Sequence, residues 1–211
     1  MIRQVIDNQL EALDTDFKYW VTIDWFSKQT SEGAVHRRHK ELRRTLRSFY
    51  KEPIKCWWFC EVHKDSSSRH YGGYHSHAVV SDCSTERWRN PSRRMDRFLS
   101  EKDPETLFTA LSGGSPSIER KCALLERVLR LSPLCPNGKE GVKVKPIHDV
   151  RGLVGRYCLK QIGRGLSIGE VIDTSNSDLD QDLWRKDWNA SRPRQQALSR
   201  WTYKSLYRST G

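Results

Sequence analysis

Hydrophobic and polar positions in the first fifty residues predict one strand followed by one helix. Residues 17–26, FKYWVTIDWF, are rich in β-branched and aromatic side chains, which is typical of a strand. Farther along, five residues recur at helical spacing with Arg and Lys between them: Val35, His39, Leu42, Leu46 and Phe49. This spacing predicts an amphipathic helix over 35–50 that ends before Pro53.

The next two apolar segments predict a hairpin. Residues 54–62, IKCWWFCEV, form one strongly apolar segment, and residues 75–80, HSHAVV, form the second. Between them, residues 63–73 are rich in Ser, Gly and charge, which is typical of a loop. Two such strands joined by a short loop predict an antiparallel pair.

The second half of the chain contains helical and strand patterns in turn. Residues 84–110 have a helical pattern broken by two prolines, and residues 115–132 form the clearest helix. Residues 142–147, VKVKPI, alternate like a strand, and a last helix is predicted over 149–163. Strands and helices in this order favour an α+β fold with a central antiparallel β-sheet and flanking helices.

The net charge of the chain indicates which class of partner it binds. The 211 residues include 37 Lys and Arg against 26 Asp and Glu, so the net charge is +11 and the pI is about 9.5. This excess favours a polyanionic partner, either nucleic acid or an acidic membrane face. No apolar run approaches the roughly 20 residues that span a bilayer, so nucleic acid is favoured and no membrane association is expected.

The cysteines and the N-terminus bear on the compartment. Residues 1–14 are too polar for a secretory signal. None of the six cysteines forms a CxxC pair, which argues against a structural zinc knuckle of the usual kind. We therefore expect reduced thiols in a cytoplasmic protein.

The stretch YGGYHSHAVV carries the first candidate site. Side chains alternate across a strand, so His75 and His77 point to the same face and Ser76 to the other. The register of the hairpin decides whether Glu61, at the end of the preceding strand, joins them. If opposed residues sum to 136, Glu61 pairs with His75 and all three share a face, whereas at 137 Glu61 pairs with Ser76 and points away.

Three interpretations of this stretch stay open. One Glu and two His suit a divalent ion, for which Mn²⁺ or Mg²⁺ is favoured over Zn²⁺. Alternatively, the histidines are a hydrogen-bonded pair at a sheet edge with no metal. A third hypothesis is a zinc site built from Cys60, His63, His70 and one of the pair.

The helix at 149–163 carries a candidate nucleophile. Tyr157 and Lys160 are three residues apart and share a helical face, with Arg164 on the same side and Arg156 adjacent. These cations can stabilise a phenolate, or hold a phosphate for the tyrosine oxygen to attack. The alternative is a tyrosine that packs its ring while the cations are solvated.

Together these motifs resemble the HUH endonucleases, specifically the single-tyrosine replication initiator (Rep) proteins of rolling-circle plasmids and viruses. The resemblance rests on an apolar first strand, Glu61 before the HxH pair, and a helical YxxK, in this order across residues 19–164. It implies a central antiparallel sheet with the metal on one face and the tyrosine helix across from it. Single-tyrosine transposases share this order and remain an alternative, as does a nucleic-acid-binding regulator without catalysis.

The resemblance also implies a reaction and a set of roles. Tyr157 attacks a DNA phosphate polarised by the metal, becomes linked to the 5′ phosphate and leaves a 3′ hydroxyl, while Lys160 positions the phosphate. Trp20 and Thr22, with Arg156 and Arg164, are expected to contact the DNA. The expected partner is single-stranded DNA at a replication origin in a prokaryotic host. No GxxxxGK[ST] motif occurs, so unwinding is assigned to a separate helicase.

Two regions follow from these motifs. Residues 1–165 are predicted to form the nicking domain. Residues 166–211 are predicted to form a basic, aromatic C-terminal segment, either binding DNA or packing as a helical cap.

Overall fold

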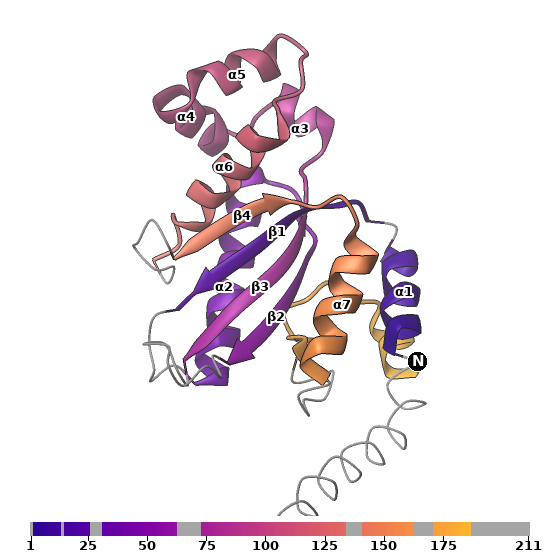
Figure 1. Ribbon diagram of the computed structural model, residues 1–211. Coiled ribbons are helices and arrows are strands. Elements are labelled where there is room, and N and C mark those ends of the chain that lie inside the picture. The colour runs from indigo at the N-terminus through magenta and orange to yellow at the C-terminus, as the bar shows by residue number, and fades with distance from the viewer. Residues whose placement is uncertain are drawn as a thin grey trace, which may run out of the picture.

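The protein has an α+β fold built on a four-stranded antiparallel sheet, as the sequence predicts (Figure 1). The computed structural model describes residues 2–13, 15–25, 31–62, 73–133, 141–162 and 171–186. The strand order is β2-β3-β1-β4. The strands are β1 (Phe17–Asp24), β2 (Cys56–Val62), β3 (Tyr74–Ser81) and β4 (Val142–Pro146).

Within the described ranges, seven helices are labelled in Figure 1, and a short helical run also occurs at residues 181–186. The labelled helices are α1 (Ile2–Leu13), α2 (Glu32–Tyr50), α3 (Thr85–Arg89), α4 (Arg93–Lys102), α5 (Pro104–Leu111), α6 (Ile118–Leu129) and α7 (Val150–Ile162). The predicted helical region 84–110 is three short helices, because Ser84, Ser92 and Asp103 each cap a new N-terminus.

The two faces of the sheet pack against different helices. The long helix α2 lies behind the sheet in Figure 1 and buries its apolar stripe there. On the other face, α7 and α1 lie side by side next to β2 and pack over its aromatic residues, among them Trp57 and Phe59. Next to this packed part, the same face of β1 and β4 carries exposed and half-buried side chains.

The apolar cluster between β2, α1 and α7 includes two segments that were not among the predicted elements. The helix α1 contributes Val5, Ile6 and Leu10, which are buried and recur at helical spacing. Within the predicted C-terminal segment, residues 171–186 pack along β2, where the Asp178 amide donates to Cys56 O at 2.8 Å. Residues 187–211 lie outside the described part of the chain.

A buried polar chain ties the back of β3 to α2. The ring of His39 lies between Asp173, 2.8 Å from Nδ1, and Ser76 Oγ, 2.7 Å from Nε2, and all three residues are buried. Trp25 donates a further hydrogen bond to Ser76 Oγ at 2.8 Å. Burial lowers the pKa of His39, which keeps the ring neutral. The strand that carries the HxH pair is thus anchored from its opposite face.

Candidate metal and nucleophile site

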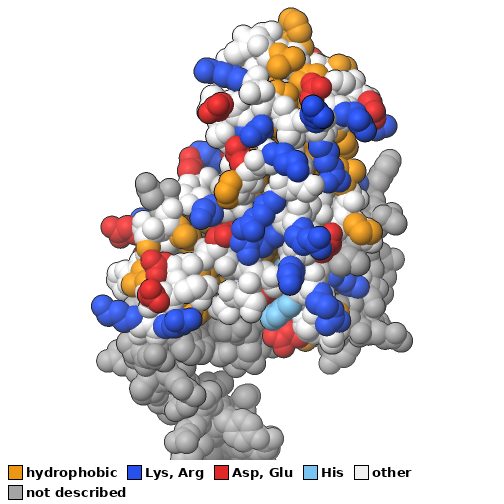
Figure 2. All heavy atoms as spheres, turned by 180° about the vertical axis from the view of Figure 1, so that it is seen from behind, with side chains coloured by type: hydrophobic (Ala, Val, Ile, Leu, Met, Phe, Trp, Pro, Cys, Tyr) orange, Lys and Arg blue, Asp and Glu red, His pale blue; other side chains and the backbone are white. Residues whose placement is uncertain are grey.

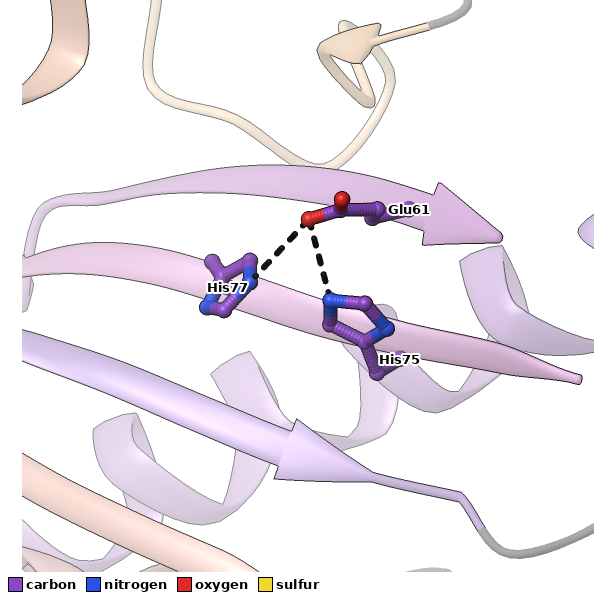
Figure 3. Close-up of side chains that lie close together, drawn as sticks. All are labelled: Glu61, His75 and His77. Carbon is purple, nitrogen blue, oxygen red and sulfur yellow. Dashed lines mark hydrogen bonds and ion pairs between the residues drawn. The ribbon is translucent and has the colours of Figure 1, made fainter. Parts of the chain in front are cut away.

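The hairpin register brings the three candidate ligands to one face. Glu61 pairs with His75, which is the first of the two predicted registers, and Phe59 pairs with His77. His75 Nε2 lies 3.0 Å and His77 Nε2 3.5 Å from the same oxygen, Glu61 Oε2 (Figure 3). One ligand atom from each residue lies within 4.8 Å of the others, so this group can hold a metal ion.

The donor set and its electrostatics fit a divalent cation. Burial alone would raise the pKa of Glu61, but hydrogen bonds from His75, His77 and Gln161 outweigh it and hold the pKa below its usual range. Burial lowers the pKa of His77. A carboxylate and a neutral imidazole are the protonation states that metal ligands need.

The first strand orients one of these ligands. Thr22 pairs with His77 across β1 and β3, and its Oγ1 lies 3.1 Å from His77 Nδ1. That hydrogen bond turns Nε2 of the ring toward Glu61, which is the usual arrangement around a ligating histidine. The Trp20 ring stacks on the His77 ring, with the two centroids 4.9 Å apart and an interplanar angle of 19°. Both residues, expected to contact DNA, therefore also support His77.

The helix α7 places its tyrosine on this group. The Tyr157 hydroxyl donates to Glu61 Oε2 at 3.1 Å, so it shares an acceptor with the two histidines. Its ring packs edge-on against His77 at 5.1 Å and Trp20 at 5.7 Å between centroids. One turn later, the buried side chain of Gln161 also contributes to the lowered pKa of Glu61. Gln161 was not predicted from the sequence.

The start of α7 is fixed by a close backbone approach. Asp149 Oδ1 accepts a hydrogen bond from the Gly152 amide at 2.8 Å, which satisfies a free N–H of the first turn. A Cβ at Gly152 would lie 1.9 Å from Asp149 Oδ2, so any larger residue here would displace the capping carboxylate. The cap fixes where α7 begins, and packing of the helix on β2 turns Tyr157 toward Glu61.

The cations near Tyr157 do not have the predicted effect on its pKa. Burial, followed by the negative charge of Glu61, raises the pKa of Tyr157, so the phenol is protonated rather than held as a phenolate. Lys160 and Arg156 are both exposed on α7. The charge of Lys160 contributes to the lowered pKa of His77, which places this lysine beside the site. Arg164 lies outside the described residues.

The structure argues against the two alternative hypotheses, the histidine pair at a sheet edge and the zinc site that includes Cys60. The strand β3 lies inside the sheet, so the histidines are not an edge pair. Cys60 pairs with Ser76 and packs in the core on the α2 side, away from the histidines, which removes it from the hypothetical zinc site. His63 and His70, the other members of that site, lie outside the described residues.

Two lysines of the edge strand extend the site in a way that the sequence analysis missed. Lys143 pairs with Thr22 and Lys145 with Trp20, so both side chains lie on the face that carries the histidines. Both are exposed. The alternating VKVKP pattern contained this signal, but only the pairing with β1 shows which face the lysines occupy.

The site therefore combines three residues that can hold a metal ion, a tyrosine hydroxyl in contact with them, and a basic, aromatic surface alongside. Such a set could support attack on a phosphate, because a hydroxyl and groups able to stabilise negative charge meet at one point. A scan of protein-family models, a search of curated proteins and a search of solved structures each found no match.

Proposed function

We propose that this protein is a metal-dependent, strand-specific nuclease and strand-joining enzyme that acts on single-stranded DNA and starts rolling-circle replication. One observation carries the proposal: the Tyr157 hydroxyl lies 3.1 Å from the same Glu61 oxygen that His75 and His77 approach. A tyrosine in contact with a candidate metal group is positioned to be a nucleophile toward a phosphate bound there.

The proposed reaction exchanges one phosphodiester for another. The Tyr157 phenol loses its proton, its oxygen bonds to phosphorus, and the bond from phosphorus to the 3′ oxygen breaks. The released 3′ oxygen takes up a proton, so a free 3′ hydroxyl remains to prime synthesis. Because the linkage energy is kept in the phosphotyrosine, a later 3′ hydroxyl can attack it and rejoin the strand.

Charge at the site supports this chemistry. A divalent ion, Mn²⁺ or Mg²⁺, bound by Glu61, His75 and His77 would act as a Lewis acid on the phosphate. Lys160, one turn from Tyr157, is placed to neutralise a phosphate oxygen. Burial beside Glu61 keeps the phenol protonated until a substrate and cation are present.

The surface beside the site suits a single strand. Trp20 is half-buried and offers a ring for base stacking, and Lys143 and Lys145 offer charges for the backbone. Together with Thr22 these residues form a path across β1 to the edge strand β4. Single-strand binding of this kind combines aromatic faces with cations, and it favours DNA that has been unwound by a separate helicase.

The test is an adduct assay with a labelled single-stranded oligonucleotide pool and Mn²⁺, resolved on a denaturing gel. We expect a covalent adduct with the wild type and none with Tyr157→Phe or with the His75→Ala, His77→Ala double variant. Tyr74→Phe is the matched control, because Tyr74 packs on the other face of β3. An adduct that persists in Tyr157→Phe contradicts the assignment of the nucleophile. Absence of any adduct with the wild type favours a regulator without catalysis.

A further inference from the structure

The outer side of α2 carries a row of cations. The inner side of this helix is buried against the sheet. On the opposite side, exposed Lys and Arg recur at intervals of three and four residues. They are Arg37, Lys40, Arg44 and Arg47 on α2, and Lys51 at its left-handed C-cap. At 3.6 residues per turn the four helical positions fall within an arc of about 80°. We call these five residues the α2 basic stripe.

The stripe is long and continues onto a neighbouring helix. At a rise of 1.5 Å per residue it extends for about 21 Å. Figure 2, which views the molecule from behind Figure 1, shows Lys and Arg side chains gathered on this face. Arg94 of α4, also exposed, donates a hydrogen bond to Ser48 at 2.9 Å, beside Arg47, and so adds a cation next to the stripe.

Few carboxylates balance this charge. Between residues 37 and 51 the chain has seven Arg and Lys and one acidic residue, Glu41. Glu41 pairs with Arg44 at 3.1 Å at an exposed position, where an ion pair contributes little. Asp178 contacts Arg43 closely and lies 3.9 Å from Arg47. Arg43 therefore belongs to the packing of residues 171–186. Arg47 is 52% exposed and at the outer limit of an ion pair, so most of the charge of the stripe is left for a partner.

We propose that the α2 basic stripe binds the phosphate backbone of double-stranded DNA, on the face of the sheet opposite the metal and tyrosine site. The charge complementarity is direct, since a duplex presents one negative charge per roughly 1.7 Å of its axis. Five cations over about 21 Å can contact phosphates along one groove edge. This inference does not depend on the chemistry proposed for the other face.

The composition of the stripe selects a duplex over two other polyanionic partners. Single-strand binding needs aromatic faces for base stacking, and the stripe has none, in contrast to the Trp20 surface. A helix that binds a membrane surface places apolar side chains in the lipid, but the apolar face of α2 is buried in the core. Among described residues, the exposed large hydrophobic side chains are Phe108, Leu111 and Leu131, none of them on α2.

The test measures binding of a random-sequence DNA duplex to the full chain by fluorescence anisotropy, in EDTA and over a range of NaCl concentrations. The variant replaces the centre of the stripe: Lys40→Gln, Arg44→Gln and Arg47→Gln. Each lost phosphate contact lowers the slope of log affinity against log salt by about 0.9, so we expect a decrease of up to about 2.7. At 0.1 M salt the affinity should fall at least about tenfold.

Two matched variants and one alternative probe decide the result. Removing the same charge from exposed positions on α3, α4 and α6, with Arg89→Gln, Lys102→Gln and Arg127→Gln, should leave most of the salt slope in place. Exchanging Lys and Arg within the stripe, with Lys40→Arg, Arg44→Lys and Arg47→Lys, should preserve binding. Equal losses in the stripe variant and the α3, α4 and α6 variant overturn the inference. Unchanged duplex binding by the stripe variant also overturns the inference. If that variant instead loses its binding to phosphatidylserine vesicles, the stripe binds a membrane surface and not DNA.

Because the duplex assay excludes divalent metal, its outcome is separate from that of the adduct assay. The stripe variant should still form the Tyr157 adduct on single-stranded DNA at the wild-type level. If the wild type forms no adduct, the proposed chemistry is contradicted. If the stripe variant still loses duplex binding in that case, this inference is supported.

Discussion

Replacing Thr22 with valine should weaken metal binding without moving the ligands out of register. Valine has the shape of threonine but lacks the hydroxyl that lies 3.1 Å from His77 Nδ1. The change leaves Glu61, His75 and His77 in place and removes only the group that orients one imidazole. It therefore tests whether the site is a metal centre or a network of polar contacts.

The magnitude follows from the burial of the histidine. The His77 side chain is 13% exposed, so Nδ1 has little access to water once its partner is gone. An unpaired buried polar atom costs about 1–3 kcal/mol, and the remaining 13% exposure of the side chain puts the loss of unfolding free energy at the lower end, about 1 kcal/mol. Loss of an outer-shell partner typically reduces metal affinity by about 10–100-fold, or about 1.4–2.7 kcal/mol.

The assay is calorimetric titration of the protein with Mn²⁺, with urea unfolding measured in parallel. Thr22→Ser is the control, because serine keeps the hydroxyl and should bind within about threefold of wild type, well short of the about 10–100-fold loss. A Mn²⁺ dissociation constant within twofold of wild type for Thr22→Val would refute the idea that Thr22 orients a ligand.

Three further predictions follow from the packing. His39→Gln should flatten the fall in stability between pH 7 and 5 by up to about 1.4 kcal/mol per pH unit, measured by urea unfolding. Burial lowers the pKa of His39 below the unfolded value of about 6.5, so in the wild type the unfolded chain takes up a proton that the native state does not. Gly155→Ala should stabilise α7 by up to about 1 kcal/mol in thermal melts, because a Cβ there meets open space. Gly152→Ala should give no such gain, because its Cβ would meet the Asp149 carboxylate. Lys143→Gln with Lys145→Gln should weaken single-stranded DNA binding more than tenfold at low salt while leaving Mn²⁺ affinity unchanged.

The sequence predicted the sheet and most of the site because local patterns carry that information. Alternation placed His75 and His77 on one face, and helical spacing placed Tyr157 and Lys160 on one side of a helix. The sequence did not decide the hairpin register, since a shift of one residue in the loop between the strands moves Glu61 to the other face. The observed pairing of Glu61 with His75 is therefore information that only the folded hairpin provides.

Long-range pairing explains what the sequence analysis missed. The roles of Thr22 and Lys143 depend on which strands neighbour β1, and strand order is not visible in local periodicity. Gln161 contributes through its reach to Glu61, one hundred residues away along the chain. Burial beside that same carboxylate also reverses the expected effect on the pKa of Tyr157, because nearby cations matter less than desolvation there.

The most direct test of the central claim is peptide mapping of the covalent adduct by mass spectrometry. The protein is incubated with single-stranded DNA and Mn²⁺, the DNA is trimmed with nuclease, and the modified peptide is sequenced. We expect one nucleotide-modified residue, Tyr157, and no modification when EDTA replaces Mn²⁺. A nucleotide on any other residue, or modification that persists in EDTA, would contradict the claim that Glu61, His75, His77 and Tyr157 form one metal-dependent site.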